Sequence, residues 1–283
     1  MDRQYFKSHT MCWGTLGTVR PFSGFHPQRD VIQIREAVQK KDAATLVRIL
    51  TNRNSAQRQD IAKIYKETTQ QELIAGMKRV LSGDLEALML ELMMPPLQHE
   101  AYRLHQAMAG LGTDEETLLE ILCTRSSEKL RGISAAYQEM YKKDLEKEAK
   151  GETSGDFAEL IVALMNKEDV SGFVQKDIES LSASLDEKKA QAAPWIDILT
   201  SRDSNHLNKV ECIQNPEVYL AKRLTGMKAA VVHGIMVSHS EEDLLGIRVA
   251  FLKLTGTSLY TTLQKNFKGY HLEALLAICR SED

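Results

Sequence analysis

A glycine-rich loop and a distant glutamate are the residues of this chain best suited to metal chemistry. Residues 108–114 read MAGLGTD, and 38 residues separate Thr113 from Glu152. Calcium prefers about six to eight oxygen ligands and accepts main-chain carbonyls as well as carboxylates. Two glycines within three residues allow the chain to turn so that successive carbonyls point to one place. These residue types are therefore compatible with a calcium site.

A simpler interpretation of the same loop needs no ion. The sequence GLGTDEE also fits the start of a helix, with Thr113 as the N-cap and Glu116 completing a capping box. No nucleophile elbow, P-loop, HExxH motif or DxDxDG calcium loop occurs elsewhere in the chain. The sequence therefore predicts a protein that is not an enzyme, and any calcium site must differ from an EF-hand.

An internal repeat sets the position of the loop in the chain. Each unit contains an apolar segment that ends in a basic residue, and in three units a glycine follows 30 residues later. The third unit lacks this glycine, because the basic residue of the fourth unit follows that of the third by only 37 positions. The segments are 49–53 (ILTNR), 121–125 (ILCTR), 198–202 (ILTSR) and 235–239 (IMVSH), and the glycines are Gly83, Gly155 and Gly269.

The apolar residues within each unit recur at helical spacing, and strand-like alternation is nearly absent. This periodicity predicts helices over 30–41, 114–124, 128–141 and 156–166. The predicted fold class is all-α, built from stacked multi-helix units.

The repeat, the glycine loop and the glutamate together resemble the annexin family. The resemblance extends from about Gly14 to Asp283. It implies an array of four multi-helix repeats, one of them truncated, and calcium-dependent binding to anionic phospholipid such as phosphatidylserine. The expected organisation is a leader (1–29), repeat I (30–96), repeat II with the calcium motif (97–168), a truncated repeat III (169–213) and repeat IV (214–283).

The same resemblance implies roles for individual residues of repeat II. Main-chain carbonyls would supply most of the calcium ligands, and one glutamate would bind as a bidentate carboxylate. Two further positions match those that hold a second, weaker ion, and the residue at the loop tip would contact lipid headgroups. The carbonyl ligands are Met108, Gly110 and Gly112, the carboxylate is Glu152, the secondary positions are Thr113 and Glu115, and the membrane contact is Leu111.

The other repeats do not keep the motif. None of them has the glycine pair, and the positions that match Glu152 are Val80 in repeat I and Asn266 in repeat IV. Because several weak sites on one face strengthen binding by avidity, a single site predicts reversible binding with a high calcium requirement. The alternative is a degenerate annexin that acts as a calcium-insensitive protein-interaction scaffold.

Charge and cysteine content indicate where such a protein works. Lys and Arg number 36 against 39 Asp and Glu, a net charge of −3, which argues against nucleic-acid binding. No apolar run reaches the roughly 20 residues of a transmembrane helix. Four widely spaced cysteines fit free thiols. We expect a cytoplasmic protein, reversibly bound at the inner face of plasma or vesicle membranes, with the leader or the truncated repeat as candidate contacts for a protein partner.

Overall fold

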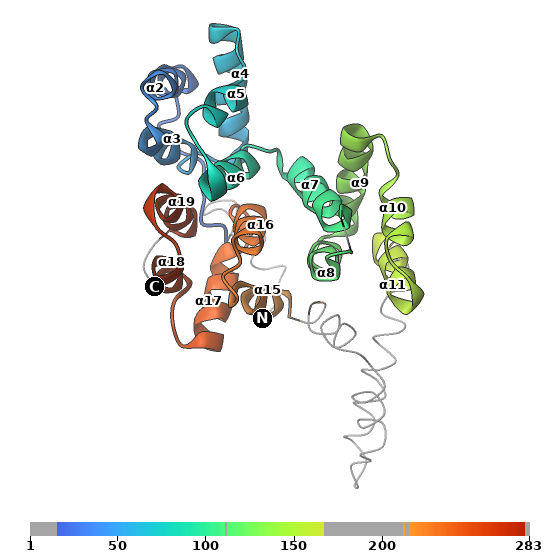
Figure 1. The fold of residues 1–283 in the computed structure, drawn as a ribbon. Coiled ribbons are helices and arrows are strands. Elements are labelled where there is room, and N and C mark those ends of the chain that lie inside the picture. Colours follow the sequence, from blue (N-terminus) through green and yellow to red (C-terminus); the bar gives the residue numbers. More distant parts are fainter. Residues whose placement is uncertain (1–15, 111, 167–211, 213–214, 281–283) are drawn as a thin grey trace. The chain divides into compact units, whose positions relative to one another are not determined.

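The computed structural model describes residues 16–110, 112–166, 212 and 215–280. Within these residues all regular structure is helical and no strand occurs, which confirms the predicted all-α class (Figure 1). The predictions made for Leu111, for residues 1–15 and for nearly all of 169–213 lie outside the described residues. The chain divides into two compact units, residues 1–99 with 221–283, and residues 100–220.

The first unit brings repeats I and IV together. Helices α3 and α6 pack against α19, and α6 also packs against α16 (Figure 1). Its helices are α2 (Pro27–Lys40), α3 (Ala43–Leu50), α4 (Ser55–Thr69), α5 (Leu73–Lys78), α6 (Gly83–Leu92), α16 (Ala229–His239), α17 (Leu244–Thr255), α18 (Leu259–Asn266) and α19 (Gly269–Cys279).

Polar contacts across 183 to 229 residues of sequence join these two repeats. The carboxylate of Glu241 accepts hydrogen bonds from the Arg58 guanidinium at 3.1 Å and from the Ser55 N–H at 2.6 Å. The Arg280 guanidinium donates to the Thr51 carbonyl at 3.2 Å and to the Asn52 side chain at 2.8 Å. The first unit is therefore closed by residues from both ends of the sequence.

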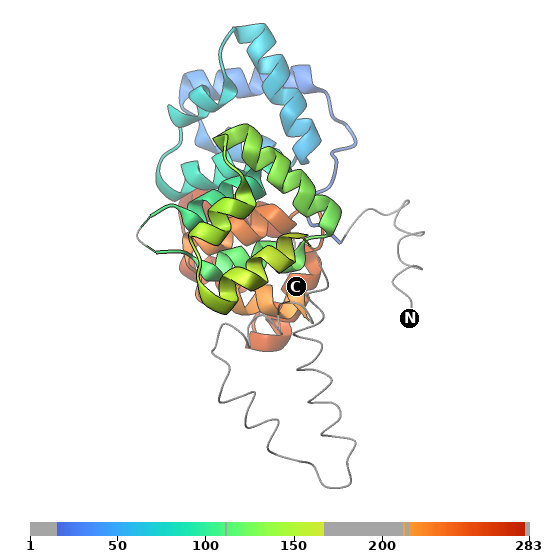
Figure 2. The ribbon, with the colours of Figure 1, turned by 90° about the vertical axis from the view of Figure 1, so that its right-hand side faces the viewer.

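The second unit carries the glycine loop. Its helices α8 (Glu115–Thr124), α9 (Ser127–Tyr141), α10 (Leu145–Gly151) and α11 (Gly155–Asn166) enclose a core to which Leu118, Ile121 and Ile133 contribute. Helices α9, α10 and α11 lie side by side in both views (Figure 2). Two further helices, α7 (Pro96–Met108) and α15 (Pro216–Leu224), contain residues of both units.

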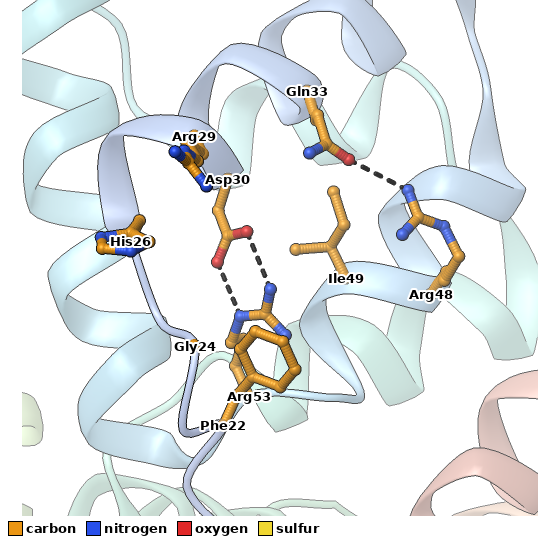
Figure 3. Close-up of a pocket in the computed structure, with 9 residues that line it drawn as sticks. All are labelled: Phe22, Gly24, His26, Arg29, Asp30, Gln33, Arg48, Ile49 and Arg53. Atoms are coloured by element: carbon orange, nitrogen blue, oxygen red, sulfur yellow. Dashed lines mark hydrogen bonds and ion pairs between the residues drawn. The ribbon is translucent and has the colours of Figure 1, made fainter.

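In the three repeated segments that the structure describes, the basic residue is buried and faces a carboxylate. Nε and Nη2 of Arg53 donate to the two oxygens of Asp30 at 2.6 and 2.8 Å, and the Phe22 ring covers the guanidinium at 4.1 Å (Figure 3). Arg125 also pairs with a carboxylate, but its Nε and Nη2 both donate to Oε1 of Glu100, at 2.8 and 2.5 Å. Such charge-assisted pairs help to fix the orientation of one helix relative to another.

The glycine that follows three of these segments has a conformational role. Gly83, Gly155 and Gly269 have φ values of +60°, +58° and +60°, and each is the first residue of a helix. Residues with a Cβ adopt this left-handed conformation at a cost. The 30-residue offset found in the sequence therefore marks the same sharp entry into the last helix of three repeats.

Candidate functional site

The glycine loop of repeat II connects α7 to α8. Helix α7 ends at Met108, whose side chain is buried in the core of the second unit. Gly110 and Gly112 have φ values of +136° and +98°, in a region that residues with a Cβ rarely adopt. A Cβ added at either position would meet no atom within 4 Å, so backbone conformation alone, and not space, favours glycine here.

Hydrogen bonds at the base of the loop fix its two ends. The Ala109 N–H donates to the His105 carbonyl, and the Asp114 N–H donates to the Ala107 carbonyl, both at 2.8 Å. Within the described part of the chain, no hydrogen bond reaches the carbonyl oxygens of the three predicted main-chain ligands. Those oxygens, on Met108, Gly110 and Gly112, can therefore accept a cation.

The hydroxyl of Thr113 joins the loop to Glu152. It donates to the main-chain carbonyl of Glu152 at 2.8 Å, across 39 positions of sequence. The expectation that Thr113 caps α8 in a box with Glu116 is wrong. Asp114 is the N-cap, and its carboxylate accepts from the N–H and the hydroxyl of Thr117 at 3.1 and 2.8 Å. Asp114 takes the capping role, so the Thr113 hydroxyl is available for the second loop.

Glu152 is exposed and directly follows α10. Its N–H donates to the Glu148 carbonyl at 3.0 Å, and the hydroxyl of Thr153 donates to the Ala149 carbonyl at 2.7 Å. The backbone around Glu152 is thus held on both sides. Its carboxylate is attached to a rigid helix end next to the glycine loop.

A side-chain network supports this helix end from within the second unit. The carboxylate of Glu148 accepts from the Tyr137 hydroxyl and from the Lys143 ammonium, both at 2.6 Å. His105 lies 3.2 Å from the Tyr137 hydroxyl and stacks on Tyr141, with ring centroids 3.9 Å apart. Sequence analysis missed this network, because residues on α7, α9 and α10 contribute to it and no local motif marks it.

The network shifts two pKa values. Burial, followed by the hydrogen bond to Glu148, raises the pKa of Tyr137 above its ordinary value. The hydrogen bond from Lys143, followed by that from Tyr137, lowers the pKa of Glu148. At neutral pH the Glu148 carboxylate is therefore ionised and the Tyr137 hydroxyl keeps its proton, which is the arrangement that this hydrogen bond needs.

The donor set of the loop suits a carbonyl-rich cation site. No cluster of three or more His, Cys, Asp or Glu side chains that could hold a metal occurs in the residues that the structure describes. A site of loop carbonyls with one carboxylate does not form such a cluster, and oxygen-only coordination fits calcium. Of the two secondary positions, Thr113 binds the Glu152 carbonyl, whereas Glu115 is half-buried at the start of α8.

The matching turn of repeat I has a different shape. There the Asp42 N–H donates to the Ala37 carbonyl at 2.8 Å, and Asp42 caps α3 by accepting from the Thr45 N–H at 3.0 Å. Two fewer residues separate the paired N–H and carbonyl than in repeat II, and Lys41, with φ of +55°, replaces the glycines. This shorter turn closes on itself and offers no extended row of carbonyls.

The described helices and the glycine loop define an all-α repeat protein with a carbonyl-lined interhelical turn. A family model for annexins matches residues 29–92, 99–164 and 219–278. Annexin A9 of Mus musculus is 32% identical over 97% of this chain and 92% of its own length, and annexin A9 of Bos taurus is 32% identical with the same coverage.

Solved structures give the same result. The structure of annexin III has a TM-score of 0.81 and 32% identity, covering 95% of this chain and 98% of its own. The structure of chicken annexin V has a TM-score of 0.81 and 31% identity, covering 94% and 99%. The chain belongs to the annexin family, as the sequence predicted. Family and fold support calcium-dependent phospholipid binding in general terms.

Annexins are generally non-enzymatic proteins that bind membranes peripherally. Among the described residues, no helix combines the length and the apolar character needed to cross a bilayer.

Proposed function

We propose that repeat II binds one calcium ion through the carbonyls of Met108, Gly110 and Gly112 and the carboxylate of Glu152, and that this ion bridges the protein to anionic phospholipid. Thr113 and Glu115 are the positions for a second, weaker ion, and Leu111 contacts the headgroup region. The protein is recruited reversibly from the cytoplasm to phosphatidylserine-containing membrane.

The hydrogen bond between Thr113 and Glu152 is the observation that carries this proposal. It joins the glycine loop, in which the three predicted ligand carbonyls accept no hydrogen bond from the described residues, to the start of the second loop, where the carboxylate of Glu152 stands. Had Thr113 capped α8, the loop would have been explained as an ordinary helix start. Asp114 performs that task instead.

The composition of the site predicts weak binding by the protein alone. One carboxylate neutralises half of the calcium charge, and carbonyls fill only part of a shell of about six to eight oxygens. Phosphate and carboxylate oxygens of a lipid headgroup complete the shell and add negative charge. Calcium and lipid therefore bind cooperatively, each raising the affinity for the other.

Co-sedimentation with phosphatidylserine vesicles across a calcium series tests the proposal. Glu152→Gln keeps the shape of the side chain and removes its charge, so vesicle binding at intermediate calcium should fall sharply. Glu139→Gln is the matched control, because Glu139 is an exposed glutamate on α9 that is not among the predicted ligands. Calorimetric titration of calcium with and without short-chain lipid should show the same loss in Glu152→Gln. Equal binding by both variants would contradict the assignment.

A calcium-insensitive interaction scaffold is the second candidate function. The observation that favours it is the state of repeats I and IV, where Val80 and Asn266 stand in the acidic position and Asn266 donates its amide to the Thr262 carbonyl at 2.8 Å. Two repeats thus lack the carboxylate that would hold an ion. Vesicle binding that is the same in calcium and in chelator would favour this second function.

A further inference from the structure

A pocket in the first unit is lined by more positive than negative side chains. It has a volume of about 310 Å³ and lies between α2, α3 and the segment that precedes α2 (Figure 3). Three arginines line it, namely Arg29, Arg48 and Arg53, and Asp30 is the one acid among the described residues that do so. These four side chains carry a net charge of +2, to which His26 at the rim adds when it is protonated.

One of the three arginines is neutralised within the protein. Arg53 donates to both oxygens of Asp30, and the Phe22 ring covers its guanidinium. Phe22 is itself held in place, because its N–H donates to Oε1 of Gln57 and its carbonyl accepts from Nε2 of Gln57, both at 3.0 Å. Arg53 and Asp30 therefore form a fixed wall of the pocket that has no net charge.

The other two arginines keep their charge at the surface. Arg29 and Arg48 are exposed, and neither forms an ion pair with a residue that the structure describes. Nη2 of Arg48 donates to a neutral acceptor, Oε1 of Gln33, at 3.1 Å. The carboxylate of Asp42, which Arg48 also attracts, accepts instead from the N–H and the hydroxyl of Thr45 at 3.0 and 2.7 Å. Both guanidinium groups can therefore bind an anion that enters the pocket.

The matching positions of repeat II show how the same place is neutralised elsewhere in the chain. Because the turn of repeat I is two residues shorter, positions before the turn correspond at an offset of 70 and positions after it at an offset of 72. Gln33 and Arg48 thus correspond to Arg103 and Glu120, which form a buried ion pair at 2.6 Å. Repeat I has a neutral residue on its first helix and the basic residue on its second. The positive charge of Arg48 is therefore not cancelled as it is in repeat II.

We propose that this pocket binds a phosphate group, carried by a soluble small molecule or by a lipid headgroup, with Arg29 and Arg48 as its charged ligands. A phosphate monoester has a charge of about −1.5 to −2 at neutral pH, which balances that of the pocket. Guanidinium groups suit phosphate oxygens because they donate in a planar, bidentate geometry. Oε1 of Gln33 accepts from Arg48, so Nε2 of the same amide is a further donor. Ile49, which is 2% exposed, lies between Arg48 and Asp30 and closes the pocket with an apolar surface (Figure 3).

Calorimetric titration with pyrophosphate in calcium-free buffer tests the site in the full-length chain. We expect saturable binding. Arg29→Gln and Arg48→Gln should each raise the Kd about tenfold or more, because each removes a hydrogen bond between charged groups. Arg35→Gln is the matched control. It removes the same charge from an exposed position of α2 that does not line the pocket, and should leave the Kd unchanged.

Vesicles identify the carrier of the phosphate. Binding in chelator to phosphatidylcholine vesicles that contain a phosphatidylinositol phosphate, with loss of binding in Arg48→Gln, would assign the phosphate to a lipid headgroup. Binding of pyrophosphate without such vesicle binding would assign it to a soluble compound. Neither measurement contains calcium, so both are independent of the calcium site in repeat II.

Three results would overturn the proposal. The first is that neither pyrophosphate nor the vesicles bind. The second is that the ligand that binds does so as tightly to Arg48→Gln as to the parent protein, because another surface would then hold it. The third is that Arg35→Gln weakens binding as much as Arg48→Gln does, because net charge and not the pocket would then be responsible. Circular dichroism of each variant verifies that the helices are intact.

Discussion

Replacing Gly112 with alanine tests whether the shape of the loop, and not only its charge, creates the calcium site. Gly112 has a φ value of +98°, and a Cβ there would meet nothing within 4 Å. The free-energy cost of placing alanine at this position is therefore backbone strain alone, about 1–3 kcal/mol for a residue held in such a region. If the loop relaxes to avoid this strain, the carbonyls no longer converge. We expect the calcium concentration for half-maximal vesicle binding to rise by about 5- to 150-fold, the equivalent of that strain.

The assay is co-sedimentation with phosphatidylserine vesicles, with Gly83→Ala as the matched control. Gly83 has a φ value of +60° and the same open surroundings, but it lies in repeat I, where Val80 replaces the acidic ligand. Gly83→Ala should lower the free energy of unfolding by about 1–2 kcal/mol and leave the calcium requirement unchanged. The reasoning is refuted if Gly112→Ala needs no more calcium than the parent protein.

Two further predictions concern the first unit. Glu241→Gln removes the carboxylate that faces Arg58, whose side chain is only 3% exposed. Burial lowers the pKa of Arg58 to about 10, so its guanidinium is still charged at neutral pH and loses the negative charge opposite it. Because Glu241 is 29% exposed, we expect a cost at the lower end of the range for a broken buried pair. The free energy of unfolding, measured by chemical denaturation, should fall by about 2–4 kcal/mol, and a fall of less than about 0.5 kcal/mol would contradict this. His233 and His271 lie 2.8 Å apart through their Nε2 atoms, and burial lowers the pKa of both. The folded-state pKa values of both histidines are below the unfolded value of about 6.5, so the unfolded chain binds more protons as pH falls through 6.5. The free energy of unfolding should therefore decrease in that range and become constant below the folded-state pKa values. Thermal melting at pH 7.5 and 5.5 should show a smaller drop for His271→Gln than for the parent, and equal drops would refute the role of the pair.

The spacing of apolar residues predicted the helices well, because each helix buries one face and that face requires apolar residues at helical spacing. The expected helix over 128–141 corresponds to α9 (Ser127–Tyr141), and the repeated basic residues correspond to buried ion pairs such as Arg53 with Asp30. The helix follows from local periodicity, and the recurrence of the basic residue was visible in the internal repeat, whereas its carboxylate partner was found only in the structure.

Other features could not be predicted because they depend on contacts between residues that are far apart in the sequence. Thr113 and Asp114 are adjacent and both can cap a helix, so only the fold reveals that Asp114 caps α8 and that Thr113 binds Glu152. The loop residues were identifiable from their types and spacing. The support that Tyr137 and Glu148 give to α10 was not, because it depends on how three helices pack.

The pairing of the first and last repeats has a consequence for biosynthesis. Helix α3 rests on α19, and the Arg280 guanidinium reaches the Thr51 carbonyl across 229 residues. The part of α3 that α19 covers must therefore stay uncovered until translation of the final helix is complete. At about 5–20 residues per second this delay lasts roughly 10 to 50 seconds. During that interval the nascent chain depends on chaperones or on its own transient collapse to avoid aggregation.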